Sequence, residues 1–214
     1  MTGLPNPSSR GVALITGGAR RIGKAMALAV GEAGFDVAIH HRGGADEAQE
    51  VVQSLQALGR RAKAFSADLA NEAEVQALVP TVTAALGPVT LLINNASLFE
   101  DDRIENQTRA SWDAHMETNL RAPIVLAQAM AAALPVDAEG LILNLLDQRV
   151  LKLNPQFFSY TLSKAALWQA TKTLAQALAP RIRVNGIGPG PTLPSIHQAE
   201  GEFEAEAANT LLQR

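Results

Sequence analysis

Tyr160 and Lys164, one helical turn apart, and Asp147 upstream of them are the residues whose types and spacing suggest chemistry most directly. A tyrosine is a poor proton donor near neutrality because its pKa is about 10, but a nearby ammonium group favours the phenolate and lowers that pKa. Residues i and i+4 lie on one face of a helix. The pair therefore predicts a tunable acid, although most such pairs are solvated surface contacts.

A glycine-rich turn near the N-terminus favours the chemical interpretation. The segment Thr16 to Gly23 reads TGGARRIG and follows a short apolar run. A turn between the first strand and the first helix directs backbone N–H groups and the helix N-terminus at a ligand, which suits a pyrophosphate. Such a turn can be a simple tight connection, and its spacing differs from GxGxxG. Its position at the start of a βαβ unit nevertheless favours a dinucleotide.

The end of the second predicted strand indicates which dinucleotide binds. An acidic residue there would bond the ribose hydroxyls and repel a 2′-phosphate. This chain has His40, His41 and Arg42 instead, with Arg20 expected close by. Arginine binds phosphate through two N–H groups, so the basic pocket predicts NADPH rather than NADH. The alternative is that Arg20 and Arg42 are ordinary surface charges.

Two further strand ends supply polar residues to the same edge. Asp68, after the third strand, can accept a hydrogen bond from adenine or can be a turn or cap residue. The sequence from Asn94 to Ser97 ends the fourth strand, at the carboxyl edge where open α/β sheets bind ligands.

Strands alternate with helices along the chain, and this pattern predicts how the residues are positioned. The strand segments are continuous apolar runs, which favours a parallel sheet covered on both faces. We therefore expect a single Rossmann-type, doubly wound α/β domain. The predicted strands are 12–15, 35–40, 62–66, 89–93, 141–146 and 181–187. The predicted helices are 22–33, 45–58, one capped by Asn71 and ending at 86, one at roughly 111–134, and the Tyr160 helix, ending at about 179.

Composition narrows the functional class. The chain has 214 residues, 47% of them hydrophobic and 18% charged, which is enough for one substantial core and one domain over residues 1–214. The net charge of −3 has the wrong sign for a general nucleic-acid binder. With no cysteine, and with four histidines that lack HExxH spacing, we expect no metal site.

The sequence also bears on location. Residues Met1 to Ser9 are polar and proline-rich, and no apolar run approaches the ~20 residues that span a bilayer. We expect a soluble cytoplasmic protein without a membrane partner. The acidic stretch from Glu200 to Glu206 is interpreted as a solvated helix face.

Taken together, the chain resembles the short-chain dehydrogenase/reductase family from about Gly11 to Thr192. Most of that family has serine at the position of Asp147 and glycine at the position of Arg21. Both departures match the pteridine reductase branch, which also resembles this chain in the segment from Asn95 to Phe99. The resemblance rests on the glycine turn, Asp68-Leu69, Asn94-Asn95-Ala96, Asn119, Tyr160-xxx-Lys164 and Asn185-Gly186-Ile187-Gly188-Pro189-Gly190.

The resemblance implies roles for individual residues. Lys164 would hold the nicotinamide ribose and lower the pKa of Tyr160, the proton donor, which would be hydrogen-bonded to Asp147. Asn119 would position a water leading to Lys164. Substrate-binding residues would be Phe99, which would stack a pterin ring against the nicotinamide, Ser97 and Arg21. The implied cofactor-binding residues are Gly17, Arg20, Arg21, Ile22, His41, Arg42, Asp68, Leu69, Asn95, Ala96, Ser97, Tyr160, Lys164, Pro189 and Gly190.

Three functions remain open from the sequence. The first is an NADPH-dependent reductase of a pterin-like ring, favoured because the Asp147 carboxylate can bind amine and ring N–H groups. The second is a carbonyl or 3-oxoacyl reductase in which Asp147 is a tolerated variant; separately, the alternative role of Phe99 is that of a hydrophobic loop plug. The third is a dinucleotide sensor without catalysis.

The C-terminal part of the chain is shorter than the resemblance leads us to expect. Family members usually continue after Gly190 with a substrate-covering helix, a further helix and a last strand, whereas this sequence stops at Arg214. We expect the sequence to be incomplete; the alternative is an open sheet edge beside the sixth strand. The segment from Pro191 would form much of the substrate lid. The resemblance also implies a homotetramer assembled through the two long helices.

Overall fold

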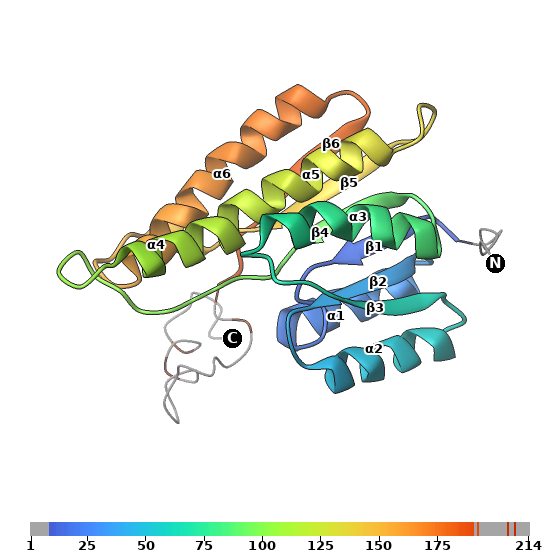
Figure 1. The fold of residues 1–214 in the computed structure, drawn as a ribbon, viewed down its shortest axis with the longest axis horizontal. Helices are drawn as coiled ribbons and strands as arrows, with labels where there is room; N and C mark the ends of the chain where they lie inside the picture. The colour runs from blue at the N-terminus through green and yellow to red at the C-terminus, as the bar shows by residue number, and fades with distance from the viewer. Residues whose placement is uncertain (1–8, 191, 193–204, 206–207, 209–214) are drawn as a thin grey trace.

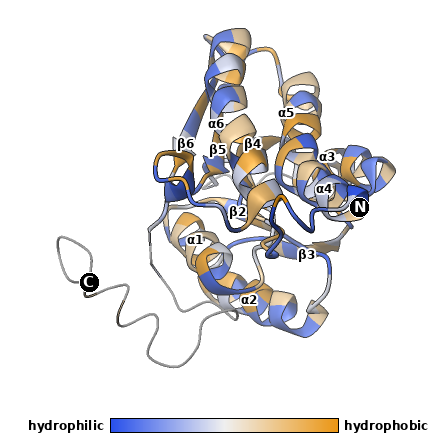
Figure 2. Cartoon of the chain, turned by 90° about the vertical axis from the view of Figure 1, so that its left-hand side faces the viewer, coloured by the Kyte–Doolittle hydropathy of each residue, from blue (hydrophilic) through white to orange (hydrophobic). Residues whose placement is uncertain are grey.

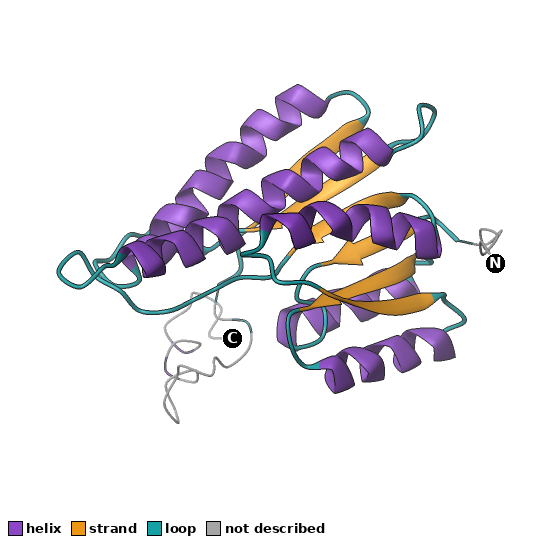
Figure 3. Ribbon diagram, viewed as in Figure 1, coloured by secondary structure: helices purple, strands orange, loops and turns teal. Residues whose placement is uncertain are grey.

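Six parallel strands form one sheet in the order β3-β2-β1-β4-β5-β6 in a computed structural model, which describes residues 9–190, 192, 205 and 208. Figures 1 and 3 show the twisted sheet with helices on both sides. The strands are β1 (Val12–Ile15), β2 (Asp36–His41), β3 (Ala62–Ser66), β4 (Val89–Asn94), β5 (Gly140–Leu145) and β6 (Ile182–Ile187). The strand order reverses between β1 and β4, and ligands bind at such a switch point in open α/β sheets.

Helices connect the strands and cover both faces of the sheet. They are α1 (Arg21–Glu32), α2 (Ala45–Ala57), α3 (Glu72–Leu86), α4 (Arg109–Met116), the π-helical turn η1 (Glu117–Arg121), α5 (Ala122–Ala133), the short 3-10 turn η2 (Gln148–Val150) and α6 (Phe158–Leu178). Apolar side chains of α3, α5 and α6 pack in one hydrophobic cluster, and those of α1 and α2 pack in another. The described residues contain no helix long and apolar enough to cross a membrane.

The side chains of β1 point alternately to the two faces of the sheet, which explains why helices cover both faces. Val12 and Leu14 belong to the cluster shared with α3 and α5, whereas Ala13 and Ile15 belong to the cluster shared with α1 and α2. Successive strand residues point to opposite faces, so a fully apolar strand must be buried on both. The covering helices carry both apolar and polar residues, as Figure 2 shows. The predicted Rossmann-type α/β fold is confirmed.

The boundaries of the helices and strands agree with the predicted ones to within a few residues. One predicted helix is instead divided by a π-helical turn. Asn71 caps α3 as expected, because its side chain accepts a hydrogen bond from the Ala73 N–H at 3.1 Å. The single helix predicted at roughly 111–134 is wrong in detail, since η1 divides α4 from α5. The π-helical turn carries Asn119, whose side chain bonds to the backbone of the loop after β4. The acidic stretch and the lid expected from Pro191 onward lie, apart from Thr192, Ala205 and Ala208, outside the described residues.

Candidate active site

The glycine-rich turn is built around close backbone contacts. Gly17 has a φ of 63°, and a Cβ at Gly23 would lie 2.1 Å from the Gly17 carbonyl oxygen, so the start of α1 packs directly on the turn. The Gly17 N–H donates to Nδ1 of His40 at 3.2 Å, and Nε2 of that ring contacts the Ala67 carbonyl at 3.0 Å. Burial lowers the pKa of His40, although its bond to Ala67 opposes this effect. A neutral ring can accept from Gly17 while donating to Ala67.

A second network joins the ends of β1 and β4. The Thr16 hydroxyl accepts from the backbone N–H groups of Asn95 and Ala96 at 2.9 and 3.0 Å. The Asn95 side-chain amide donates to the carbonyls of Thr16 and Gly17 at 2.9 and 3.1 Å. These hydrogen bonds therefore hold the turn after β1 against the loop after β4, at the switch point of the sheet.

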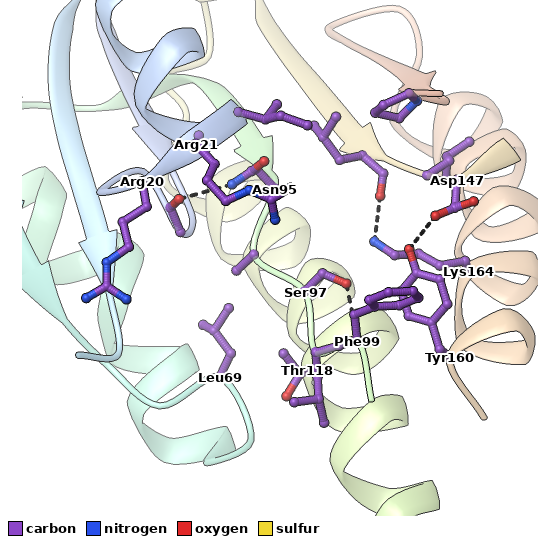
Figure 4. A pocket seen from close by; sticks show the side chains of 18 of the residues that line it. Arg20, Arg21, Leu69, Asn95, Ser97, Phe99, Thr118, Asp147, Tyr160 and Lys164 are labelled. Carbon is purple, nitrogen blue, oxygen red and sulfur yellow. Dashed lines mark hydrogen bonds between the residues drawn. The ribbon is translucent and has the colours of Figure 1, made fainter. Parts of the chain in front are cut away.

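A pocket with a volume of about 860 Å³ lies over these loops. Figure 4 shows Arg20 and Arg21 towards one end and Asp147, Tyr160 and Lys164 towards the other. Every site residue predicted from the sequence lines this pocket except Asn119. The fold thus brings these predicted residues together from distant parts of the chain.

Tyr160, Lys164 and Asp147 form the polar group at one end of the pocket. Tyr160 and Lys164 both lie in the first turns of α6, and their side chains are buried. The Tyr160 hydroxyl donates to Oδ2 of Asp147 at 2.7 Å, as predicted. Nζ of Lys164 donates to the carbonyl of Leu145, the last residue of β5, at 2.8 Å.

The electrostatics of this group differ from the sequence-based expectation. The pKa of Tyr160 is raised, not lowered, first by burial and then by the charge and the hydrogen bond of Asp147. The expectation that Lys164 lowers that pKa is wrong in this structure, because its Nζ faces the Leu145 carbonyl and lies 5.8 Å from the tyrosine ring centroid. Burial lowers the pKa of Lys164 itself to about 8, against the attraction of Asp147. Tyr160 is thus a neutral phenol near pH 7.

Aromatic rings surround the tyrosine. Phe99 meets Tyr160 in an edge-to-face arrangement, with ring centroids 4.6 Å apart. The Phe99 ring is also stacked on the Phe157 ring, with the two centroids 4.1 Å apart and an interplanar angle of 6°. The pocket therefore has an apolar, flat wall directly beside its hydroxyl and carboxylate groups.

Comparisons with known proteins agree with this geometry. The family model described as short chain dehydrogenase matches residues 11–205. The chain belongs to the short-chain dehydrogenase/reductase family. The family assignment made from the motifs is confirmed.

Individual relatives of this short-chain dehydrogenase/reductase are close in sequence and structure. The structure of FolM alternative dihydrofolate reductase 1 from Brucella canis, complexed with NADP, is 50% identical, with a TM-score of 0.93 over 97% of this chain and 82% of that chain. A short chain dehydrogenase from Burkholderia cenocepacia J2315, in complex with NADP, is 37% identical, with a TM-score of 0.89 over 98% of this chain and 86% of that one. The FolM likeness supports the resemblance to the pteridine reductase branch.

A further relative is named for a different activity. The 3-oxoacyl-[acyl-carrier-protein] reductase FabG of Staphylococcus epidermidis is 34% identical over 179 residues, which are 83% of this chain and 73% of the relative. FolM and FabG are both reductases by name, and they differ in the substrate for which they are named.

In this short-chain dehydrogenase/reductase, Asn119 lies behind the pocket wall. Its side chain accepts from the Leu98 N–H at 2.8 Å and donates to the Leu98 carbonyl at 2.9 Å and the Ser163 hydroxyl at 3.0 Å. The Ser97 hydroxyl also donates to it, at 3.2 Å. Asn119 therefore ties the loop that carries Ser97 and Phe99 to α6, and its role in positioning water stays a prediction.

The end of the pocket that carries Arg20 and Arg42 is less basic than predicted, because an acidic residue pairs with one of them. Arg20 forms an ion pair with Glu47 of α2, with Nε 3.0 Å from the carboxylate, whereas Arg42 is exposed. Asp68 accepts a bond from the Ala70 N–H at 3.0 Å, which matches the turn interpretation of this residue. Within the part of the chain that the structure describes, no three His, Asp or Glu side chains gather as a metal site would require.

Arg149 and Phe157 also line the pocket and were not predicted from the sequence. Phe157 precedes Tyr160 by three positions, a spacing that would place both on one helix face and could have marked it. Arg149 follows Asp147 by two positions, but nothing in that spacing indicates where a long side chain turns.

Proposed function

We propose that this chain is an NADPH-dependent reductase that transfers a hydride to a ring C=N bond of a pterin-like substrate. The observation that carries the proposal is the 2.7 Å bond between Tyr160 and Asp147 in the pocket. The chain is an oxidoreductase by family, and NADP complexes of relatives at 50% and 37% identity support the choice of cofactor.

The residues around the pocket fit a dinucleotide phosphate. The turn at Gly17 to Gly23 leaves backbone close to the space above α1, and Nδ1 of His41 is buried without a hydrogen-bond partner among the described residues. Such an orphaned nitrogen at the end of β2 is available to a ligand. Arg20 and Arg42 would bind the 2′-phosphate, and Lys164 would hold the nicotinamide ribose. When bound, NADPH supplies the hydride.

The choice of substrate rests on chemistry at Asp147. A carboxylate accepts hydrogen bonds from amine and ring N–H groups, which a pterin offers and a simple ketone does not. The Phe99 ring gives a flat heterocycle an apolar surface beside the reacting groups. The name of the 50% identical FolM, alternative dihydrofolate reductase, supports a substrate of this class.

Reduction of a C=N bond requires one hydride and one proton. The hydride adds to the carbon, and the nitrogen takes a proton as its electron pair forms the new N–H bond. Tyr160 carries its proton near pH 7, because burial and Asp147 raise its pKa. A phenol held by Asp147 within the pocket can therefore donate or relay that proton to the substrate nitrogen.

A second candidate is an NADPH-dependent carbonyl or 3-oxoacyl reductase. The 34% identity to FabG favours it. In that case the Tyr160 proton would be transferred to a carbonyl oxygen, and Asp147 would be a tolerated replacement for serine. The sensor hypothesis is not retained, because the family and its reductase relatives indicate an enzyme.

The decisive experiment is NADPH oxidation with 7,8-dihydrobiopterin and dihydrofolate, compared with an acetoacetyl thioester. We expect turnover of the dihydropteridines and at most weak activity on the thioester. Asp147→Ser should lower kcat/KM for the dihydropteridines at least about tenfold, as expected for loss of a charge-assisted bond. Activity confined to the thioester, unchanged or increased in Asp147→Ser, would overturn the pterin assignment in favour of the second candidate.

The homotetramer expected from the family resemblance and the cytoplasmic location expected from the sequence remain proposals. Light scattering on the purified protein, at concentrations used for activity, would test the first. A monomer of full activity would contradict it.

A further inference from the structure

Arg149 lies at the pocket wall beside the candidate catalytic group. It belongs to η2, and its backbone N–H donates to Oδ1 of Asp147 at 2.8 Å. Its guanidinium lies 4.8 Å from the ring centroid of Phe157 and 5.8 Å from that of Phe99. The backbone bond and the ring contacts together fix a positive charge next to the aromatic wall.

The hydrogen-bonding capacity of this guanidinium is unused. Nη1 of Arg149 is buried and has no hydrogen-bond partner within the described part of the chain. No carboxylate of that part lies within ion-pair distance of it, whereas Arg20, Arg61, Arg103, Arg109 and Arg121 each have one. A buried N–H of a charged group is costly without an acceptor, and a planar guanidinium matches a carboxylate with two parallel bonds.

We propose that Arg149 binds a carboxylate of the substrate. The preferred substrate is then a flat nitrogen heterocycle that carries a carboxylate, as dihydrofolate does on its glutamate, rather than a dihydropterin without one. The heterocycle part of this inference rests on the proposed function. The carboxylate part rests on Arg149 and its aromatic neighbours alone.

The rival explanation is that Arg149 acts only on Tyr160. Its charge lowers the pKa of that tyrosine, against the larger effects of burial and Asp147. A purely electrostatic role would affect all substrates equally and would shift the pH profile of kcat. Carboxylate binding would instead change affinity for carboxylate-bearing ligands and leave other ligands unaffected.

The test measures binding to the protein saturated with NADP⁺, so that no hydride transfer takes place. Calorimetric Kd values are compared for folate, for 6-hydroxymethylpterin and for 4-aminobenzoylglutamate, which carries carboxylates without a pterin. Arg149→Met should raise the Kd of both carboxylate ligands about tenfold or more, the range for loss of a charge-assisted bond, and that of the pterin less than about twofold. Arg149→Lys, which keeps charge without the planar fork, should be intermediate.

Lys152→Met is the matched control, because it removes a positive charge three residues away at an exposed position outside the pocket. Its Kd values should equal those of the wild type. An unchanged Kd for NADP⁺ and an unchanged Tm establish that Arg149→Met is folded.

Equal losses for carboxylate and non-carboxylate ligands, or no loss for either, would overturn the assignment of Arg149. The proposed function fails separately, if dihydropteridines are not reduced while folate or 4-aminobenzoylglutamate still binds in an Arg149-dependent way. That result would keep the carboxylate site and direct the substrate search to other carboxylate-bearing compounds.

Discussion

At the scale of single residues, the proposed proton donation and cofactor binding would depend on two neighbours, Tyr160 and Lys164, whose pKa values are shifted in opposite directions. Tyr160 is held protonated by burial and by Asp147. Lys164 is buried, with 2% of its surface exposed, and its amine reaches the Leu145 carbonyl. Burial favours the uncharged form of each side chain, so it raises the pKa of the phenol and lowers that of the amine.

Lys164 leads to a prediction about the alkaline limb of activity. Its pKa is lowered to about 8, so the ammonium group that would hold the ribose is lost as pH rises through that value. We expect kcat/KM for NADPH to fall above about pH 8, approaching about tenfold per pH unit for loss of a single proton. Steady-state rates from pH 6 to 10 would measure this limb.

Lys164→Arg is the matched variant, because a guanidinium stays charged throughout this range. Whatever its absolute rate, its profile should lack the limb near pH 8. Titration of Lys164 would not cause the loss of activity above pH 8 by unfolding the protein. Its pKa is lower in the folded state than its ordinary 10.5, so its deprotonation increases the free energy of unfolding as pH rises from about 8 to 10.5. A wild-type profile that stays flat to pH 10 would contradict the prediction.

At the scale of elements, the start of α6 is positioned by the loop that follows β4. The buried carboxylate of Asp102 accepts from the Ser159 N–H at 2.8 Å and from the Ser111 hydroxyl at 2.5 Å. Its carbonyl accepts from the Phe158 N–H at 2.9 Å. The first N–H groups of a helix have no partner within the helix, so these bonds complete its N-terminus just before Tyr160.

Asp102→Ala should therefore destabilise the protein by about 2 kcal/mol, the cost of leaving buried donors without an acceptor. Urea unfolding monitored by circular dichroism would measure the loss. Asp113→Ala is the control, because the Asp113 carboxylate forms an ion pair with Arg109 within α4, and such surface pairs contribute about 0.5 kcal/mol or less. Equal stability of the two variants would show that Asp102 does not anchor α6.

The elements were largely predictable because local pattern determines them. All six strands were predicted from the sequence, and Asn71 marked a helix start that the structure confirms. The π-helical turn at Asn119 was not predictable, because it depends on bonds to Leu98 and Ser163 from other parts of the chain. Arg149 was missed for the same reason: where its guanidinium lies depends on Phe157 and Phe99, which no local pattern places beside it.

At the scale of the whole molecule, the pocket joins two halves of the sheet, strands β3-β2-β1 and strands β4-β5-β6. The turn after β1 and His41 belong to the first half, whereas Tyr160 and Lys164 lie on α6, which connects β5 and β6 of the second half. A dinucleotide that spans the pocket would contact both halves. Binding to the folded state alone raises the stability of the whole protein.

NADPH should therefore raise the melting temperature, and NADH should raise it less. At 100 times its Kd a ligand adds about 2.7 kcal/mol, which for a domain of this size corresponds to a Tm increase of roughly 5–10 °C. The extra effect of NADPH would come from the 2′-phosphate, so Arg42→Ala and Arg20→Ala should each reduce its shift towards that of NADH. Differential scanning fluorimetry at matched nucleotide concentrations would measure these shifts.

Glu47→Gln distinguishes the contribution of Arg20 to the NADPH shift from that of Arg42, because Glu47 pairs with Arg20. Glu47 holds the Arg20 guanidinium in this structure, and a phosphate that takes this guanidinium has to replace that carboxylate. Removing the charge of Glu47 should leave the NADH shift unchanged and increase the NADPH shift, because Arg20 is then free to bind the phosphate. If NADPH and NADH stabilise the wild type equally, and Glu47→Gln changes neither shift, the basic residues near β2 do not select the cofactor.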